Sequence, residues 1–262
     1  MIRRIKRSDK FEISLVVKDD QFIRPPKDAQ RNALLNRAIK EFAEDLTALD
    51  HQAGKFVQGA VQNTFIDRTQ AILDDQEIME DWQVPVMQAM AGIVTESQGD
   101  ILEIGFGRGI SSDMIQSHRV RSHTIIECND AIVARFYQWK GNYQDRDIRL
   151  VHGLWQDVMD GLGCFDGIFF HTYPLNEDEY MNYVNGSVTF AAHFFETAEK
   201  HLRPEGVFTY FSNEIDSLGR EHQRLILKHF SSFSAEIVEL NVPDDVKDTW
   251  WANSMVVIKA VK

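Results

Sequence analysis

The sequence predicts a three-layer α/β protein in which helices cover both faces of a seven-stranded sheet, preceded by a mainly helical N-terminal extension. From Gly99 onward, short β-rich runs alternate with helical stretches five times, which is typical of parallel strands joined by crossover helices. The last two β-rich runs are separated only by residues 241–253, without a strong helical pattern. Such a short link favours an antiparallel pair over a crossover.

Composition narrows the functional classes. The 28 Lys and Arg residues against 40 Asp and Glu give a net charge of −12, and no basic stretch beyond the first seven residues suits a nucleic-acid backbone. Cys128 and Cys164 lie in no pattern for a disulfide framework or a metal site. No apolar run approaches the roughly 18 residues of a membrane span. We expect a cytoplasmic protein without metal, nucleic acid or stable membrane association.

Residues 1–82 form the predicted extension. Residues 11–17 alternate between polar and apolar and suit an edge strand, and apolar residues recur at helical spacing from Asp28 to about Leu49. We expect this extension to act as a lid over a substrate or as the contact of a homodimer. Residues 83–262 form the second predicted domain.

The second domain is predicted to contain seven strands and four main helices. We expect strands at 101–104, 123–127, 148–151, 165–170, 207–211, 235–240 and 254–261, helices at 111–117, 131–140, 187–202 and 219–230, and a turn at 203–206. Five parallel strands followed by an antiparallel pair form the Rossmann-like sheet of class I methyltransferases that use S-adenosylmethionine (SAM). In such sheets the ligand binds at the carboxyl ends of the strands.

The first strand ends in a glycine-rich turn. Gly105, Phe106, Gly107 and Gly109 follow Glu103, but Ile110 stands where a dinucleotide fingerprint needs glycine. Glycines let the backbone approach a ligand closely. Because SAM carries a cationic amino group and a sulfonium, an acid at this position suits SAM better than a dinucleotide.

Three later strand ends carry further candidates. Glu127 ends the second strand 22 residues after Gly105, the spacing of an acid that accepts ribose hydroxyls. Asp157 follows the third strand, where an acid can accept the adenine amino group. His171 follows the fourth strand and would face the transferable methyl, or would only shape the loop.

Several motifs together resemble the guanidinoacetate N-methyltransferase family. They are E-I-G-F-G at 103–107, I-I-E-C-N-D at 125–130, G-L-W-Q-D at 153–157, F-D-G-I at 165–168 and T-Y-P-L at 172–175, with M-E-D-W at 79–82 and P-V-M at 85–87. The resemblance runs from about Ile78 to Phe211. It implies a SAM site built from Glu103, the turn at 105–109, Glu127, Cys128, Asn129, Gln156, Asp157 and His171, with Met79 and Met87 as walls.

The sequence departs from this family where the acceptor binds. The family has an Asp before T-Y-P and a Glu after the upstream Trp, and these carboxylates hold the guanidinium of its substrate; here the positions are His171 and Gln83. A guanidinium without a counter-charge in a dry pocket costs several kcal/mol. Creatine synthesis, and the activity of the similar protein arginine methyltransferases, are therefore not expected unless Asp74, Asp75 or Asp81 supplies an acid.

The predicted function is methyl transfer from SAM to a small-molecule acceptor, with nitrogen favoured and S-adenosylhomocysteine as the product. The expected substrate contacts are Trp82, Gln83, His171, Thr172, Tyr173 and Glu214. His171 and Tyr173 are the catalytic candidates, and His171 either accepts a proton or only positions the substrate. The alternatives are an O- or C-methyltransferase for a carboxylate, hydroxyl or keto acid, and a SAM-binding protein without catalytic activity.

Overall fold

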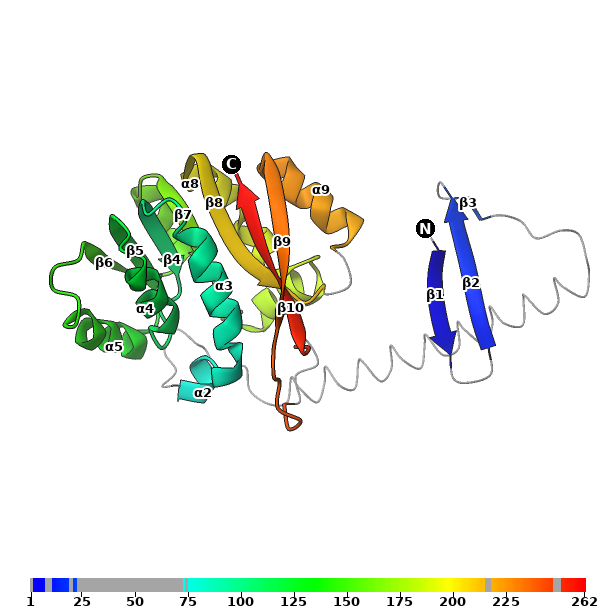
Figure 1. Ribbon diagram of the computed structural model, residues 1–262, viewed down its shortest axis with the longest axis horizontal. Coiled ribbons are helices and arrows are strands. Elements are labelled where there is room, and N and C mark those ends of the chain that lie inside the picture. The colour runs from blue at the N-terminus through cyan, green and yellow to red at the C-terminus, as the bar shows by residue number, and fades with distance from the viewer. Residues whose placement is uncertain are drawn as a thin grey trace, which may run out of the picture. The chain divides into compact units, whose positions relative to one another are not determined.

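The computed structural model describes residues 2–7, 11–18, 21–22, 73, 75–214, 218–246 and 251–262 (Figure 1). The chain divides into two compact units, Met1–Thr64 and Phe65–Lys262. The helix expected within residues 28–49 lies outside the described residues, as does Asp74. No helix in the described ranges is long and apolar enough to cross a membrane.

The first unit contains a small antiparallel sheet. It consists of β1 (Ile2–Arg7), β2 (Phe11–Lys18) and β3 (Gln21–Phe22), in that order. Ile2 lies opposite Val16 and Arg7 opposite Phe11. The strand expected over 11–17 is present as β2, whereas β1 was not expected, because its basic residues lack a strand-like alternation.

The second unit is built on a seven-stranded sheet, as expected (Figure 1). Its strands are β4 (Asp100–Ile104), β5 (Ser122–Glu127), β6 (Ile148–His152), β7 (Phe165–Phe170), β8 (Leu202–Ser212), β9 (Ser232–Glu239) and β10 (Ser254–Val261). They lie in the order β6-β5-β4-β7-β8-β10-β9, and β10 is antiparallel to both of its neighbours. The parallel pairs β4–β5 and β4–β7 place the ends of three strands at one edge.

Helices cover both faces of this sheet, which gives the three predicted layers. The helices α3 (Val84–Val94), α4 (Ile110–Ser117) and α5 (Asp130–Lys140) pack on one face, and α8 (Phe195–His201) and α9 (Arg220–His229) on the other. Neighbouring strand residues alternate between the faces: Ile101 belongs to the first cluster and Leu102 to the second.

Short elements connect the main strands and helices of the second unit. They are α2 (Asp75–Ile78), η2 (Asp81–Gln83), α6 (Trp155–Val158), η3 (Met159–Gly161), α7 (Glu177–Glu179), η4 (Tyr180–Asn185) and η5 (Phe190–Phe194). The helix expected over 187–202 thus begins at Phe190 as a 3-10 turn and ends at His201.

The turn expected at 203–206 is instead part of β8. The register of β7 with β8 shifts between Phe165 and Gly167, and Glu205 adopts a φ of +62°. The N–H of Lys262 donates to the carbonyl oxygen of Gly206 at 3.0 Å. Pairing with the end of β10 therefore keeps this irregular segment in the sheet, a long-range contact that local turn signals do not contain.

Candidate functional site

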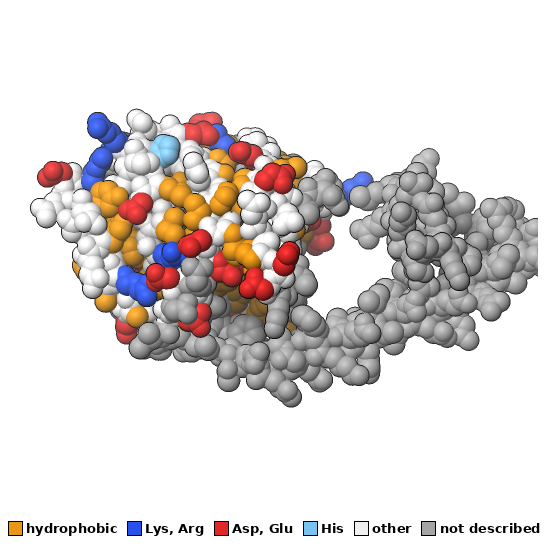
Figure 2. All heavy atoms as spheres, turned by 60° about the horizontal axis from the view of Figure 1, so that its bottom comes forward, with side chains coloured by type: hydrophobic (Ala, Val, Ile, Leu, Met, Phe, Trp, Pro, Cys, Tyr) orange, Lys and Arg blue, Asp and Glu red, His pale blue; other side chains and the backbone are white. Residues whose placement is uncertain are grey.

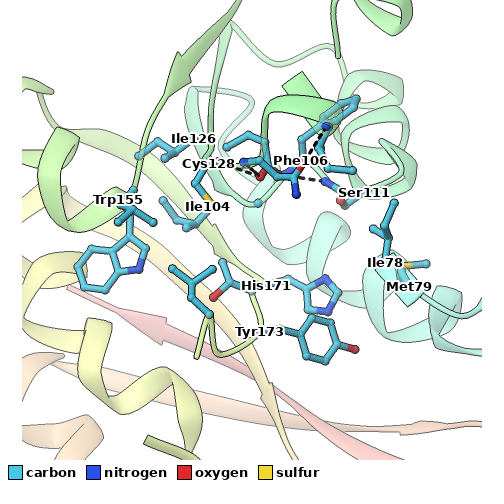
Figure 3. Close-up of a pocket in the computed structure, with 18 of the residues that line it drawn as sticks. Ile78, Met79, Ile104, Phe106, Ser111, Ile126, Cys128, Trp155, His171 and Tyr173 are labelled. Carbon is cyan, nitrogen blue, oxygen red and sulfur yellow. Dashed lines mark hydrogen bonds between the residues drawn. The ribbon is translucent and has the colours of Figure 1, made fainter. Parts of the chain in front are cut away.

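Two adjoining pockets open at the carboxyl ends of the strands. The larger pocket, about 1000 Å³, lies beyond β4, β5, β6 and β7 and contacts Ile78, the glycine turn and Trp155 (Figure 3). The smaller pocket, about 680 Å³, is lined by Phe170, Tyr180, Tyr210, Phe211, Trp251 and their neighbours. The two pockets share His171, Thr172, Tyr173 and Phe190. Each pocket therefore has access to the end of β7.

The glycine turn after β4 requires its glycines. Gly105, Gly107 and Gly109 have φ angles of +89°, +54° and +78°. Residues that carry a Cβ atom rarely adopt such angles. A Cβ at Gly105 would lie 2.6 Å from the carbonyl oxygen of His171. The absence of a side chain therefore lets β4 and β7 meet at their ends and places the His171 segment beside the larger pocket.

Glu127 lies at the end of β5, where the sequence predicts it, and lines the larger pocket. One carboxylate oxygen accepts the N–H of Phe106 at 2.9 Å, and the other accepts those of Cys128 at 2.8 Å and Asn129 at 2.9 Å. The Asn129 side chain caps α5 by accepting the N–H of Ala131 at 2.9 Å. These bonds hold one buried negative charge beside the glycine turn.

Glu103 contacts neither pocket in this structure. Its side chain is fully buried on the face of β4 that α4 covers, 3.0 Å from the His123 ring. Its two oxygens accept the hydroxyls of Ser111 and Ser112. Because Ser111 lines the larger pocket, Glu103 reaches that pocket only through this serine. Local spacing could not predict this, since it does not say where α4 packs.

The remaining cofactor candidates separate into two groups. Those that line the larger pocket are Met79, Gly105, Phe106, Gly107, Cys128, Asn129, Gln156 and His171. Three others do not line it: Met87 packs in the core without exposure, Gly109 begins α4, and Asp157 is exposed on α6. Asp157 follows Gln156 in a helix, and consecutive helical residues point about 100° apart, so only one of the two faces the pocket.

His171 lies between the pockets with its ring buried. Its Nε2 atom has no hydrogen-bond partner among the described residues, and its ring centroid is 5.4 Å from that of Phe211 and 5.8 Å from that of Tyr173 (Figure 3). Burial lowers the pKa of His171 to about 4. The ring is therefore neutral at pH 7 and is a weaker base than an imidazole in water.

The predicted substrate residues lie beside the smaller pocket to different degrees. Thr172 and Tyr173 line it, whereas Gln83 contacts it indirectly, since its side-chain amide donates to the Tyr173 hydroxyl at 3.4 Å. Trp82 packs edge-on against Trp251, with ring centroids 4.8 Å apart, and Trp251 lines the pocket. The residues of η2 therefore contact the smaller pocket only through Tyr173 and Trp251.

No Asp or Glu is among the described residues that line the smaller pocket. The suggested replacement acids lie elsewhere and are paired: Asp81 bonds to Arg108 at 2.6 Å, and Asp75 forms an ion pair with Arg135. Glu214 lies outside both pockets, where it bonds to His222 and to the N–H of Gly219. Among the described residues, therefore, none offers a guanidinium in the smaller pocket a direct counter-charge.

Sequence reasoning missed several residues of both pockets. They include Glu179 in the larger pocket, Tyr210 and Phe211 in the smaller one, and Phe190 in both. The Phe190–His193 spacing, which places two rings on one helical face, was a usable signal. No sequence signal indicated Tyr210, because a tyrosine in a strand is typical of the hydrophobic core.

Known proteins resemble this chain in fold and, more distantly, in sequence. The N-methyltransferase NodS from Bradyrhizobium japonicum, solved with S-adenosyl-L-homocysteine, is 14% identical with a TM-score of 0.50, covering 78% of this chain and 97% of that one. Spermidine synthase from Thermotoga maritima is 16% identical with a TM-score of 0.50, covering 70% and 61%. At these identities the likeness concerns the fold alone.

Curated relatives are similar in sequence to this chain over part of their length. Protein arginine N-methyltransferase 2 of Eremothecium gossypii is 26% identical over 155 residues, which cover 56% of this chain and 34% of the relative. The protein of the same name from Kluyveromyces lactis is 26% identical over 182 residues, covering 64% and 40%. The chain thus spans only about a third to two fifths of these relatives.

These names correct the expectation of a small-molecule acceptor, because the relatives are named for a protein acceptor. The motifs behind that expectation are those expected to bind the cofactor, which methyltransferases of both kinds need, so they could not separate the two. The expected homodimer stays unconfirmed.

The family match is more extensive than the motifs suggest. A profile described as guanidinoacetate N-methyltransferase matches residues 55–247, beyond the span 78–211 that carries the sequence motifs. The chain is a SAM-dependent methyltransferase, and SAM is its cofactor. By this match over most of its length, the chain belongs to the guanidinoacetate N-methyltransferase family.

Proposed function

We propose that this chain methylates a nitrogen atom of a polypeptide, and that the acceptor group is flat and uncharged rather than an arginine guanidinium. Among protein side chains a histidine imidazole fits this description. The observation that carries the proposal is the composition of the smaller pocket, which is rich in aromatic side chains and contains no Asp or Glu among its described lining residues.

The larger pocket suits the cofactor. Glu127 and Glu179 line it, and its one Arg or Lys among the described lining residues, Arg108, is already bonded to Asp81. The pocket therefore presents a net negative charge to a sulfonium cation. Glu127 and the glycine turn would hold the ribose side, and Gln156 would contact the adenine side. SAM supplies an electrophilic methyl group there.

The smaller pocket suits a neutral acceptor. A guanidinium would have to leave water without a carboxylate to pair with, at a cost of several kcal/mol. The flat rings of Phe170, Phe211 and Trp251 provide aromatic surface for a planar group. His171 lines this pocket, and its neutral state at pH 7 avoids a repulsive charge.

A polypeptide acceptor is supported from two sides. The curated relatives are named for protein substrates. In addition, the face of the second unit seen in Figure 2 shows hydrophobic side chains gathered among charged ones, both acidic and basic. The whole chain has a net charge of −12, and a negatively charged protein attracts a basic polypeptide and increases its rate of association.

The chemical step needs positioning more than strong base catalysis. The acceptor nitrogen donates its lone pair to the methyl carbon, the bond from that carbon to sulfur breaks with both electrons left on sulfur, and the acceptor loses one N–H proton. Holding the two reactants in line supplies much of the rate. His171 and Tyr173, which touch both pockets, are placed to orient the acceptor.

The test uses two matched sets of peptides and SAM labelled in its methyl group. Each set carries one candidate residue at the centre, flanked by lysines in one set and by glutamates in the other. After acid hydrolysis, we expect labelled methylhistidine, mainly from the lysine-flanked set. The control variant Glu127→Ala should transfer no label.

Other products would contradict the proposal in distinct ways. Methylarginine as the main product would refute the neutral acceptor. Label that is released by mild base would indicate an O-methyl ester. Label found only in low-mass compounds, after incubation with a whole cell extract, would refute the polypeptide acceptor.

A further inference from the structure

Three polar side chains, two of them buried, form a continuous hydrogen-bonded chain that begins at a residue of the smaller pocket. Tyr210, on β8, lines that pocket and is 1% exposed. Its hydroxyl lies 2.6 Å from Nε2 of His222, a residue of α9 without exposure. The other ring nitrogen, Nδ1, bonds to the carboxylate of Glu214.

The partners determine the direction of these hydrogen bonds. A carboxylate can only accept, so Nδ1 of His222 carries the proton that it donates to Glu214. In a neutral imidazole the second nitrogen is then an acceptor, and the hydroxyl of Tyr210 donates to Nε2. The lone pairs of the Tyr210 oxygen are thereby left available to accept a further proton.

We propose that Tyr210, His222 and Glu214 form a proton relay that takes the acceptor's N–H proton out of the smaller pocket during methyl transfer. The proton of the acceptor passes to the Tyr210 oxygen, the Tyr210 proton to Nε2 of His222, and the Nδ1 proton of His222 to Glu214. Tyr210 and His222 end neutral, and Glu214 ends as a carboxylic acid, so that every proton is accounted for.

The exit of the relay reaches solvent. The Glu214 side chain is 24% exposed, whereas His222 is not exposed at all. Glu214 is held from its other side, since one of its oxygens accepts the N–H of Gly219 at 3.0 Å. A proton delivered to Glu214 can therefore leave to water without crossing the pocket.

The surroundings of Tyr210 explain why a relay is needed rather than a tyrosinate base. Burial, together with the negative charge of Glu214, raises the pKa of Tyr210 well above its usual value. A lone phenolate is thus strongly disfavoured, and Tyr210 can accept a proton only while it passes its own to His222. Burial also makes the His171 ring a poor base, which leaves Glu214 as a base connected to the smaller pocket through side chains.

This inference rests on the proposed function, because it requires an acceptor that loses a proton. Tyr210 would be a catalytic residue, whereas His222 and Glu214 would be positioning residues that act through it. In this chain His171 stands where the family motif has an Asp, and the relay would connect the smaller pocket to a different carboxylate, that of Glu214.

The kinetic test compares two conservative variants with matched controls. Glu214→Gln keeps an acceptor for the His222 N–H but not a proton sink, and Tyr210→Phe keeps the ring but not the hydroxyl. The controls are Glu199→Gln, whose carboxylate bonds to His229 at 2.8 Å, and Tyr143→Phe, whose hydroxyl bonds to Asp113 at 2.7 Å. Neither control pair lines a pocket.

With the peptide that wild type labels best, we expect both relay variants to lower kcat by about 100-fold or more, with KM for the peptide little changed. Glu214→Asp should recover part of the loss, and both controls should match wild type. Wild-type kcat for Glu214→Gln, with the thermal shift by SAM intact, would overturn the relay.

A spectroscopic experiment tests the relay without knowledge of the acceptor. In protein labelled with ¹⁵N at histidine, NMR should show His222 as the tautomer with the proton on Nδ1, and Glu214→Gln should alter its signals. If His222 instead carries its proton on Nε2, the relay is wrong even when methylation of peptides is confirmed. If wild type labels no peptide but the tautomer is as expected, the acceptor proposal fails, and the kinetic comparison is repeated with the compound that a cell extract shows to be labelled.

Discussion

The backbone N–H of Phe106 donates a hydrogen bond to the carboxylate of Glu127 at 2.9 Å, which joins the turn after β4 to the end of β5 through one side chain. The same carboxylate accepts the N–H groups of Cys128 and Asn129. Glu127 thus supports the shape of the larger pocket and also presents a negative charge to it. Loss of the side chain should affect both.

For Glu127→Ala we expect loss of most of the stabilisation that SAM provides. At a SAM concentration about 100 times the dissociation constant, wild type should gain roughly 2.7 kcal/mol, measured by thermal unfolding with and without SAM. Glu127→Gln should also lose much of this gain, because it keeps one acceptor but no charge. An unchanged shift in both variants would mean that the cofactor binds elsewhere.

For Gly105→Ala we expect lower stability and loss of SAM binding. The new Cβ would lie 2.6 Å from the carbonyl oxygen of His171, at a φ of +89°, and such strain costs on the order of 1–3 kcal/mol. Gly163→Ala is the matched control, since a Cβ there meets nothing within 4 Å. Chemical unfolding of both variants gives the comparison, and equal stability would contradict the predicted strain.

The buried ring of His171 should make stability depend on pH. Its folded-state pKa is about 4, below the ordinary value of 6.5, so between these values the unfolded chain binds a proton that the folded chain does not. Stability is therefore lost as the pH falls from about 6.5 to 4, by on the order of 3 kcal/mol. His171→Asn should remove this part of the pH dependence, measured by urea unfolding at each pH.

The exposed histidine His118, outside both pockets, is the control for that experiment. His118→Asn should leave the difference between pH 6.5 and pH 4 close to that of wild type. If His171→Asn also leaves it unchanged, the His171 ring is hydrated in solution.

The double variant His171→Asp with Gln83→Glu should gain affinity for a guanidinium. It returns carboxylates to the two positions where this chain differs from the family motifs, next to a pocket without Asp or Glu in its described lining. We expect an arginine peptide to stabilise the double variant against heat, and the matching citrulline peptide, which is uncharged, to have little effect. Stabilisation of wild type by the arginine peptide would contradict the neutral acceptor.

The fold and the meeting of the glycine turn with Glu127 could be predicted from the sequence because both depend on local patterns. The alternation of strand and helix determines the order of the parallel strands within narrow limits. A glycine turn and an acid at the next strand end, such as Gly105 and Glu127, must meet, because the carboxyl ends of adjacent parallel strands lie at one edge. Their bond through Phe106 is the direct result.

Other features depended on how segments pack, and no local pattern contains that information. Glu103 faces the core because α4 brings Ser111 and Ser112 against it. Tyr210 reaches a pocket only because segments far apart in the chain, around His171 and Trp251, close around it.

The sequence by itself determined the class of enzyme and the strand ends at which we propose that SAM binds, whereas the tertiary structure decided the composition of the smaller pocket. The reason is physical: the larger pocket is lined largely by turns and strand ends, whose geometry follows from short motifs. The smaller pocket is made of side chains from distant segments, so its composition, and the bond between the buried residues Tyr210 and His222, exist only once these segments have packed together.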